Sequence, residues 1–100
     1  MTRKDQLLGY LEGACRGRAY RIGGKELERA LNISGTDLRK LVNKLRQETE
    51  PIASDQTGYF YADNAGDIYA TIRHLRKMRD GIDAALRGLE QSLDKFPVGR

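Results

Sequence analysis

The chain has 100 residues, of which 39% are hydrophobic and 32% charged, a length and balance that allow one domain with a modest core. Its net charge is +4, and the excess lies in the first half, where 11 basic residues face 7 acidic ones against 7 and 7 in residues 51–100. The single cysteine excludes an internal disulfide and a cysteine-based zinc finger. No apolar run resembles a signal peptide or is long enough to cross a bilayer, so we expect a cytoplasmic protein without a membrane partner.

The chain begins with a segment that predicts an amphipathic helix from Thr2 to about Arg16, although two glycines inside it cost about 1 kcal/mol each relative to Ala. Cys15 follows an apolar stripe in this helix, so we expect a buried thiol. The stripe consists of Leu7, Leu8, Leu11 and Ala14. Beyond it, Ala19–Ile22 lies between glycines and predicts a short strand that pairs with a later hairpin.

A pair of helices joined by a tight turn is predicted next. The first helix starts near Gly24 and carries Leu27, Ala30 and Leu31 on one face. Asn32 ends it, because Asn tolerates the left-handed backbone conformation that such a turn requires. Ile33 is placed to pack between the two helices.

The second helix of the pair is predicted from Gly35 to Gln47. Ser34 can cap its first turn, and Asp37 three residues later resembles the partner of a capping box. With a step of 100° per residue, the inner stripe consists of Leu38, Leu41, Val42 and Leu45. The outer face is then formed by Thr36, Arg39, Lys40, Asn43, Lys44 and Gln47.

The outer face of this second helix carries the side chains that DNA recognition uses. Arg and Lys bind phosphates or guanine edges, and Asn and Gln pair bidentately with adenine. An isolated helix with such a face would more simply be a solvated amphipathic helix. The preceding helix and turn favour DNA binding instead. We expect contacts from Ser34 and Arg46 as well, with Arg39, Asn43 and Thr36 nearest the bases and Lys40, Lys44 and Arg46 nearest the phosphates.

Two short strands follow and predict a hairpin, or wing. Pro51 blocks further helix, and the runs Ile52–Ser54 and Tyr59–Ala62 flank the turn-rich segment Asp55–Gly58. If Ile52 and Phe60 point toward the core, Tyr59 and Tyr61 lie on the opposite face. The hairpin tip carries Asp55 and no basic residue, so we expect a supporting role, or DNA contact through backbone amides and the Gln56 and Thr57 side chains.

These features resemble the biotin-repressor type of winged helix, and more closely the small winged-helix proteins of phages and prophages, in which a similar hairpin precedes a long C-terminal helix. The resemblance covers the chain from about Tyr20. It implies a winged helix-turn-helix fold of the α+β class, mostly α, and a recognition helix bearing Thr36, Arg39, Lys40, Asn43 and Lys44. The residues that carry it are Gly24–Leu27, Leu31–Ser34, Leu38–Arg46 and Gly58–Phe60. Asn32 departs from the pattern, since Gly is common there, and so does the hairpin tip without basic residues.

A long helix is predicted from Asp67 to Lys95, capped by Asp63 or Asn64. Its apolar residues alternate in spacings of four and three, which is a heptad pattern interrupted at Arg79. The series is Ile68, Ile72, Leu75, Arg79, Ile82, Leu86, Leu89 and Leu93.

The long helix exceeds what one small domain can cover, and two alternatives remain open. It bends back onto its own domain near a glycine, or its distal part, from Leu75 to Leu93, pairs with a second chain to form a homodimer, which we favour. In a dimer, Arg79 would fix the register, or extend to solvent or pair with Asp83. The expected organisation is a DNA-binding domain at 1–66, a dimerisation helix at 67–95 and a tail at 96–100.

No catalytic constellation is present in the sequence. His74 is the only histidine, and the carboxylates of the long helix alternate with basic residues as they do on solvated helix faces. We therefore expect no enzyme activity, no cofactor, no metal and no small-molecule substrate. The sequence predicts a sequence-specific binder of double-stranded DNA, as a phage, prophage or bacterial transcriptional regulator or replication accessory. The alternative is a winged-helix protein-interaction module without direct DNA binding.

Overall fold

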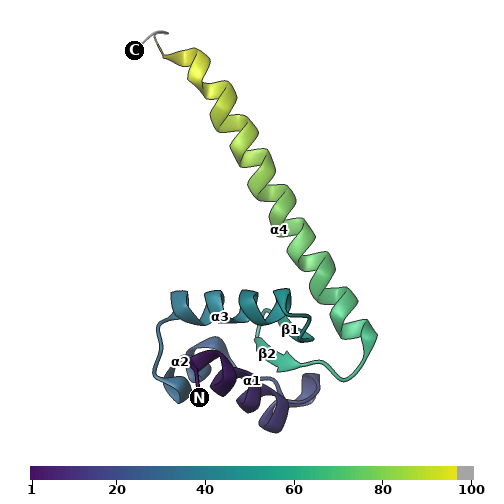
Figure 1. Cartoon of the computed structure of the whole chain (residues 1–100). Helices are drawn as coiled ribbons and strands as arrows, with labels where there is room; N and C mark the ends of the chain where they lie inside the picture. Colours follow the sequence, from purple (N-terminus) through teal and green to yellow (C-terminus); the bar gives the residue numbers. More distant parts are fainter. Residues whose placement is uncertain (97–100) are drawn as a thin grey trace.

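The structure is a computed structural model that describes residues 1–96 (Figure 1). Its fold is α+β and mostly helical, with a helix-turn-helix, a two-stranded antiparallel hairpin and a long C-terminal helix, as the sequence predicts. Residues 97–100, which make up most of the predicted tail, lie outside the described part. The elements are α1 (Arg3–Ala14), η1 (Arg18–Tyr20), α2 (Gly24–Leu31), α3 (Gly35–Gln47), β1 (Ile52–Asp55), β2 (Gly58–Tyr61), α4 (Ala65–Ser92) and η2 (Leu93–Lys95).

A complete capping box stabilises the N-terminus of the first helix. The Thr2 hydroxyl accepts from the Asp5 amide at 3.1 Å, and the Asp5 carboxylate accepts from the Thr2 amide at 3.4 Å. The helix ends two residues before the predicted Arg16. Cys15 is buried, as expected, and desolvation raises the pKa of its thiol above the ordinary value, which keeps it in the unreactive protonated form.

The predicted strand at Ala19–Ile22 is wrong for most of its length. A 3₁₀ turn occupies Arg18–Tyr20, because the amides of Tyr20 and Arg21 donate to the carbonyls of Gly17 and Arg18 and so close a local turn. Gly17 begins this turn with φ at +88°, a value that favours glycine. Within this segment only Ile22 pairs with the hairpin, through an antiparallel bridge to Tyr59, while Arg16 before it forms a parallel bridge to Tyr61.

The helix-turn-helix forms as predicted. Asn32 has φ at +54° and ends α2 in the left-handed conformation, and the Ser34 hydroxyl accepts from the Asp37 amide at 3.1 Å at the start of α3. Ile33 packs against the core between the two helices. Ala30 differs from the prediction, since it is exposed while Leu27 and Leu31 of the same helix are buried.

The hairpin is buried on both faces, which corrects the predicted placement of its side chains. The register pairs Ile52 with Tyr61 and Ala53 with Phe60, and its turn has two residues instead of four. Ile52 therefore belongs to the main core between the first three helices, whereas Phe60 lies on the other face, with Ala53 and Ile68. Tyr59 and Tyr61 share the main-core face with Ile52. The prediction that Ile52 and Phe60 share a face is wrong, because in this register Phe60 pairs with Ala53, and successive residues such as Ile52 and Ala53 point to opposite faces of the hairpin.

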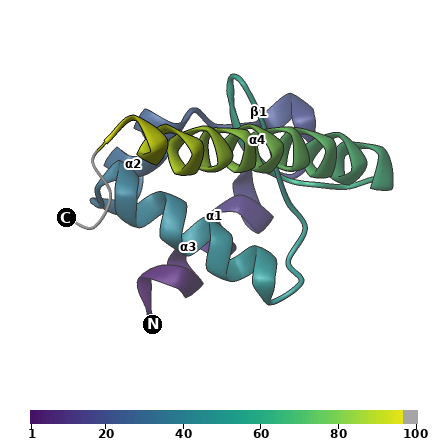
Figure 2. The ribbon, with the colours of Figure 1, turned by 90° about the horizontal axis from the view of Figure 1, so that it is seen from above.

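The long helix α4 leaves the domain after its first two turns (Figure 1). The Asn64 side chain caps it by accepting from the Asp67 amide at 3.0 Å, so the helix starts at Ala65, two residues earlier than predicted. Its early residues pack on the hairpin, whereas every residue from Arg73 to Gln91 is exposed. Seen from above, α4 crosses the domain obliquely to α3 (Figure 2). Among the described residues, no helix is both long and apolar enough to span a membrane.

Candidate nucleic-acid interface

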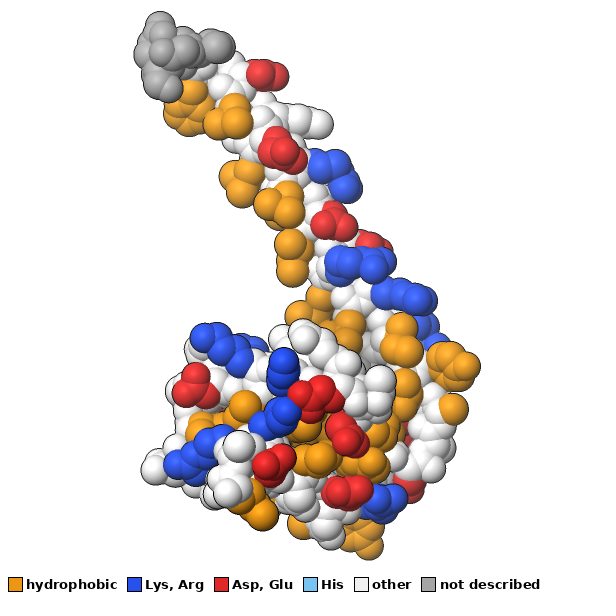
Figure 3. Space-filling view, viewed as in Figure 1, with side chains coloured by type: hydrophobic (Ala, Val, Ile, Leu, Met, Phe, Trp, Pro, Cys, Tyr) orange, Lys and Arg blue, Asp and Glu red, His pale blue; other side chains and the backbone are white. Residues whose placement is uncertain are grey.

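The outer face of α3 is a free cationic surface. Its six predicted residues, Thr36, Arg39, Lys40, Asn43, Lys44 and Gln47, are all exposed. In the described part of the chain, the three cations of this face form no ion pair, whereas Arg16, Arg18 and Arg21 outside it are each within 4 Å of a carboxylate. Arg39 makes only a 3.4 Å contact to the Thr36 hydroxyl. Basic side chains gather along the edge of the domain where α3 lies (Figure 3). This face can exchange its solvent for phosphates without first breaking an internal ion pair.

Arg46 is less exposed than the six residues of this face and is hydrogen-bonded within the domain, while its predicted contact with phosphates stays a prediction. Its Nε donates to the Ile52 carbonyl at 2.9 Å and its Nη2 to the Ser54 hydroxyl at 3.1 Å. Burial lowers the pKa of its guanidinium below the ordinary value. Arg46 therefore joins α3 to β1. The Ser34 hydroxyl accepts from the Asp37 amide as the cap of α3, and the residue is exposed.

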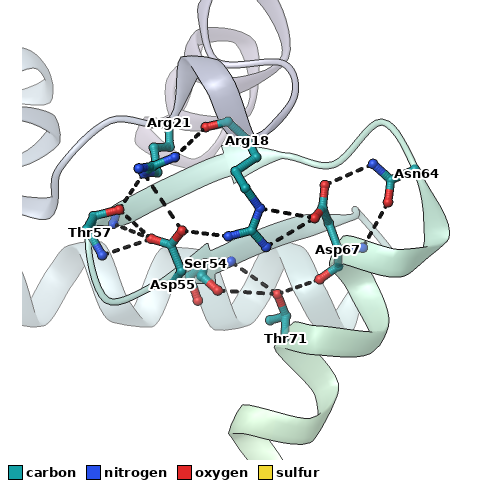
Figure 4. A network of polar contacts seen from close by, with 9 residues as sticks. Arg18, Arg21, Ser54, Asp55, Thr57, Asn64, Asp67 and Thr71 are labelled. Carbon is teal, nitrogen blue, oxygen red and sulfur yellow. Dashed lines mark hydrogen bonds and ion pairs between the residues drawn. The ribbon is translucent and has the colours of Figure 1, made fainter.

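The hairpin turn is organised around the Asp55 carboxylate. It accepts from the Thr57 hydroxyl at 2.7 Å and from the amides of Thr57 and Gly58 at 2.8 and 3.1 Å (Figure 4). These hydrogen bonds, the one from the hydroxyl above all, hold the pKa of Asp55 below its ordinary value, and Arg21 adds to the effect. The Thr57 hydroxyl also accepts from Arg21. Thr57 and Gln56 are both exposed at the tip, and their predicted contacts with DNA stay a prediction.

Asp55→Asn is expected to lower the free energy of unfolding by about 1 kcal/mol at pH 7, because an amide keeps the turn but loses the charge that two arginines face. Since the folded-state pKa is depressed, this stabilisation is present above the unfolded-state pKa and lost as the pH falls through the folded-state pKa. Urea unfolding at pH 7 and at about pH 3 measures it. The difference from wild type should shrink at the lower pH, and a constant difference would contradict the assigned role. Asp80→Asn, on exposed α4, is the control.

A groove of about 430 Å³ brings α3, the hairpin turn and α4 together. Arg39 and Asn43 line one wall, and Gln56 and Thr57 line the end formed by the hairpin. The structure thus unites side chains that the sequence placed on separate predicted elements. The remaining wall comes from His74, Leu75 and Met78 of α4, which sequence reasoning did not assign to the interface. Only the direction in which α4 leaves the hairpin puts them there, and no local pattern encodes that direction.

The groove divides the outer face of α3 into two sides. Arg39 and Asn43 lie on the side that faces α4. By the 100° step, Lys40 and Lys44 lie on the other side, away from the long helix. Basic and amide groups are thus available both inside the groove and on the open surface beside it.

The predicted dimerisation residues of α4 form an exposed stripe. Leu75 is 37% exposed, and Ile82, Leu86, Leu89 and Leu93 are between 53% and 67% exposed. In Figure 3 the apolar side chains follow the edge of α4 that faces the domain, across an open space. Met78, at 51% exposed, widens the stripe and was missed because it falls between two positions of the heptad series. Arg79 approaches Asp80 at 3.7 Å instead of the predicted Asp83.

A network of polar side chains, the hairpin–helix joint, fixes the base of α4 (Figure 4). Arg18 donates to Asp55 at 3.0 Å and to Asp67 at 3.1 Å, so one guanidinium bridges the hairpin turn and the first turn of α4. The Thr71 hydroxyl, which is buried, accepts from the Ser54 amide at 3.2 Å and donates to the Asp67 carbonyl at 3.0 Å. The joint thus sets the direction of α4 relative to α3.

The side chains on the outer face of α3 and in the groove include basic groups and amides, which can bind a ligand through ion pairs and hydrogen bonds. In the described residues, no group of three or more His, Cys, Asp or Glu side chains is placed to hold a metal ion. A comparison of the chain with protein-family models, curated proteins and solved structures gave no match. The outer face of α3 and the groove beside it are therefore the features from which a function is inferred.

Proposed function

We propose that the chain binds double-stranded DNA through α3. The observation that carries the proposal is the set of Arg39, Lys40 and Lys44, exposed cations without a carboxylate partner in the described residues, on the second helix of a helix-turn-helix. That helix is the one that enters the major groove in proteins of this architecture. The neighbouring Asn43 and Gln47 supply the amides that read base edges.

The geometry refines the roles within this set. Thr36, Asn43 and Gln47 lie closest to the centre of the outer face and would approach the bases, whereas Lys40 and Lys44 on the open side would contact phosphates. Arg39 lies at the groove, where it would reach either a guanine edge or a phosphate. We no longer include Arg46 among the DNA-binding residues, because its guanidinium is hydrogen-bonded to the Ile52 carbonyl of β1.

The biological role stays a prediction: a phage, prophage or bacterial regulator of transcription, or a replication accessory. A cytoplasmic location is part of the same proposal, because the DNA of a bacterial cell lies there. We also propose that the binding is sequence-specific. Selection of bound duplexes from a random pool would test it, with an enriched common sequence as the expected result.

A fluorescence-anisotropy titration with random duplex separates DNA binding from the alternative, a protein-interaction module. The expected result is binding with a dissociation constant below about 10⁻⁴ M that weakens steeply between low and moderate salt. The exposed stripe on α4 and the acidic residue at the hairpin tip favour the interaction module. If no binding is detected in this range, the protein-interaction module becomes the better assignment.

Lys44→Ala is expected to weaken binding to every duplex and to lower the slope of log affinity against log salt by about one, because one phosphate contact and its released counterions are lost. Anisotropy titrations at four or five salt concentrations measure the slope. Lys77→Ala on α4 is the matched control, since it removes an exposed lysine that does not belong to the outer face of α3. Equal slopes for wild type and Lys44→Ala would refute the phosphate role of Lys44.

A further inference from the structure

The exposed stripe of α4 has a spacing that reads the same from both ends. Its positions are separated by four, three, four, three and four residues, and its centre lies at Ala84. When two such helices run in opposite directions, every position of one therefore meets a position of the other. The positions are Leu75, Arg79, Ile82, Leu86, Leu89 and Leu93.

The charges along α4 are divided between its two halves. The segment Arg73–Arg79 contains four basic residues and no acidic one, whereas Asp80–Asp94 contains four acidic residues and one basic residue. A parallel pair would place like halves side by side and would set Arg79 against its own copy inside the apolar seam. In the antiparallel register that matches the two stripes, Arg73–Arg79 faces residues 89–95 of the other copy, which contain two acidic residues, Glu90 and Asp94, and one basic residue, whereas Asp80 and Asp83 lie near the centre of the pair. Charges beside a helix seam choose orientation in this way.

We propose that α4 pairs with α4 of a second copy of this chain in the antiparallel orientation. In this register Leu75 meets Leu93, Arg79 meets Leu89 and Ile82 meets Leu86 of the second copy, and each contact occurs twice. The pairing covers the apolar stripe along its whole exposed length, including side chains that are more than half exposed in the single chain.

The register also pairs charges beside the seam. Arg76 lies on the flank where, in an antiparallel pair, it faces Glu90 of the second copy, and both are exposed in the single chain. Arg79, opposite Leu89, reaches toward the same carboxylate. Asp83 meets its own copy near the two-fold axis, a repulsion that Arg79 one helical turn away offsets. The two Arg76–Glu90 contacts are absent from a parallel pair, whose flanks bring different residues together.

The pairing does not depend on DNA binding. The second helix would lie in the open space on the stripe side of α4, next to the groove wall formed by Leu75 and Met78. Arg39 and Asn43 would then lie beside the second copy, whereas Lys40 and Lys44 remain on the open side of α3. A dimer without DNA binding and DNA binding without a dimer are therefore separate experimental results.

Disulfide cross-linking of Arg79→Cys with Leu89→Cys tests the orientation. Both positions are exposed and lie beyond the domain, so the folded core is untouched. In the proposed register the two cysteines of a mixed pair are adjacent, but identical cysteines lie ten residues, about 15 Å, apart along the pair, beyond the roughly 7 Å limit for a disulfide. Mild oxidation should therefore give a covalent dimer from the mixture and none from either variant alone.

The controls make each outcome decisive. Wild type should give no covalent dimer, because Cys15 is buried. Dimers from each single variant would show parallel pairing, and no dimer in any sample would show that the helices do not pair; either result overturns the proposal. Sedimentation of wild type at micromolar concentration, with an expected mass twice that of one chain, checks pairing without any substitution.

A charge exchange tests the register. Arg76→Glu or Glu90→Arg alone should weaken the dimer by about three- to tenfold, because each places like charges together at two symmetric contacts. The double variant should recover wild-type dimerisation. Equal weakening by the double variant would overturn the register. The random-duplex titration of the same variants reports DNA binding separately, so loss of the dimer and loss of DNA binding are told apart.

Discussion

Gly58→Ala is expected to lower the free energy of unfolding by about 3 kcal/mol, because there is no room for a methyl group at this position. A Cβ atom on Gly58 would lie 2.2 Å from the Ile22 carbonyl oxygen and 3.1 Å from the Gly23 nitrogen, both of them backbone atoms. The Ile22 segment would have to move away and break its paired hydrogen bonds with Tyr59, at 2.8 and 2.9 Å. Urea unfolding monitored by circular dichroism measures the loss.

Gly81→Ala is the matched control for this substitution. Gly81 lies in the exposed part of α4, and a Cβ there would meet no atom within 4 Å. Alanine should favour the helix by about 0.5 to 1 kcal/mol relative to glycine. Equal effects of the two substitutions, or a Gly58→Ala variant as stable as wild type, would show that the Ile22 segment does not lie against the hairpin as described.

Arg46→Met is expected to lower the free energy of unfolding by about 2 kcal/mol while leaving the salt dependence of DNA binding at its wild-type slope. Methionine keeps much of the apolar stem but leaves the Ile52 carbonyl and the Ser54 hydroxyl without their guanidinium donor. Chemical unfolding and salt-dependent anisotropy on the same preparation measure both quantities.

Arg39→Met is the comparison for Arg46→Met. Arg39 is exposed and has only a weak contact with Thr36, so its loss should change stability by less than about 0.5 kcal/mol and should act on DNA binding instead. The opposite pattern, with Arg46→Met stable but reduced in salt slope, would return Arg46 to the phosphate-binding set.

Features set by neighbours in sequence were predictable. The left-handed Asn32, the Ser34 cap and the inner stripe of α3 each depend on residues within one or two helical turns, where propensity and the 3.6-residue period act. The Asn64 cap and the length of the helix it begins follow in the same way. The outer face of α3 was predictable because it is what the inner stripe leaves outside.

Features set by contacts across the chain were not predictable. The hairpin is buried on both faces because the main core packs on one face and Ile68 of α4 packs on the other. In its register Ile52 pairs with Tyr61 and Ala53 pairs with Phe60, which puts Ile52 and Phe60 on opposite faces. Arg46 lies at the edge of its helix face, where the period alone does not show that β1 offers it two acceptors. Arg18 binds Asp55 and Asp67, which lie 37 and 49 positions further along the chain, and no local pattern predicts these contacts.

The hairpin–helix joint makes α4 a lever. The 28-residue helix is about 42 Å long, so a rotation of about ten degrees at its base would move its far end by about 7 Å. Arg18 and Thr71, which restrain that base, therefore act at a distance on whatever the far end carries. In an antiparallel pair, two such levers lie side by side with a domain at each end. The angle held by these side chains then determines how far apart the two α3 helices are, and hence which spacing along a duplex both can occupy at once.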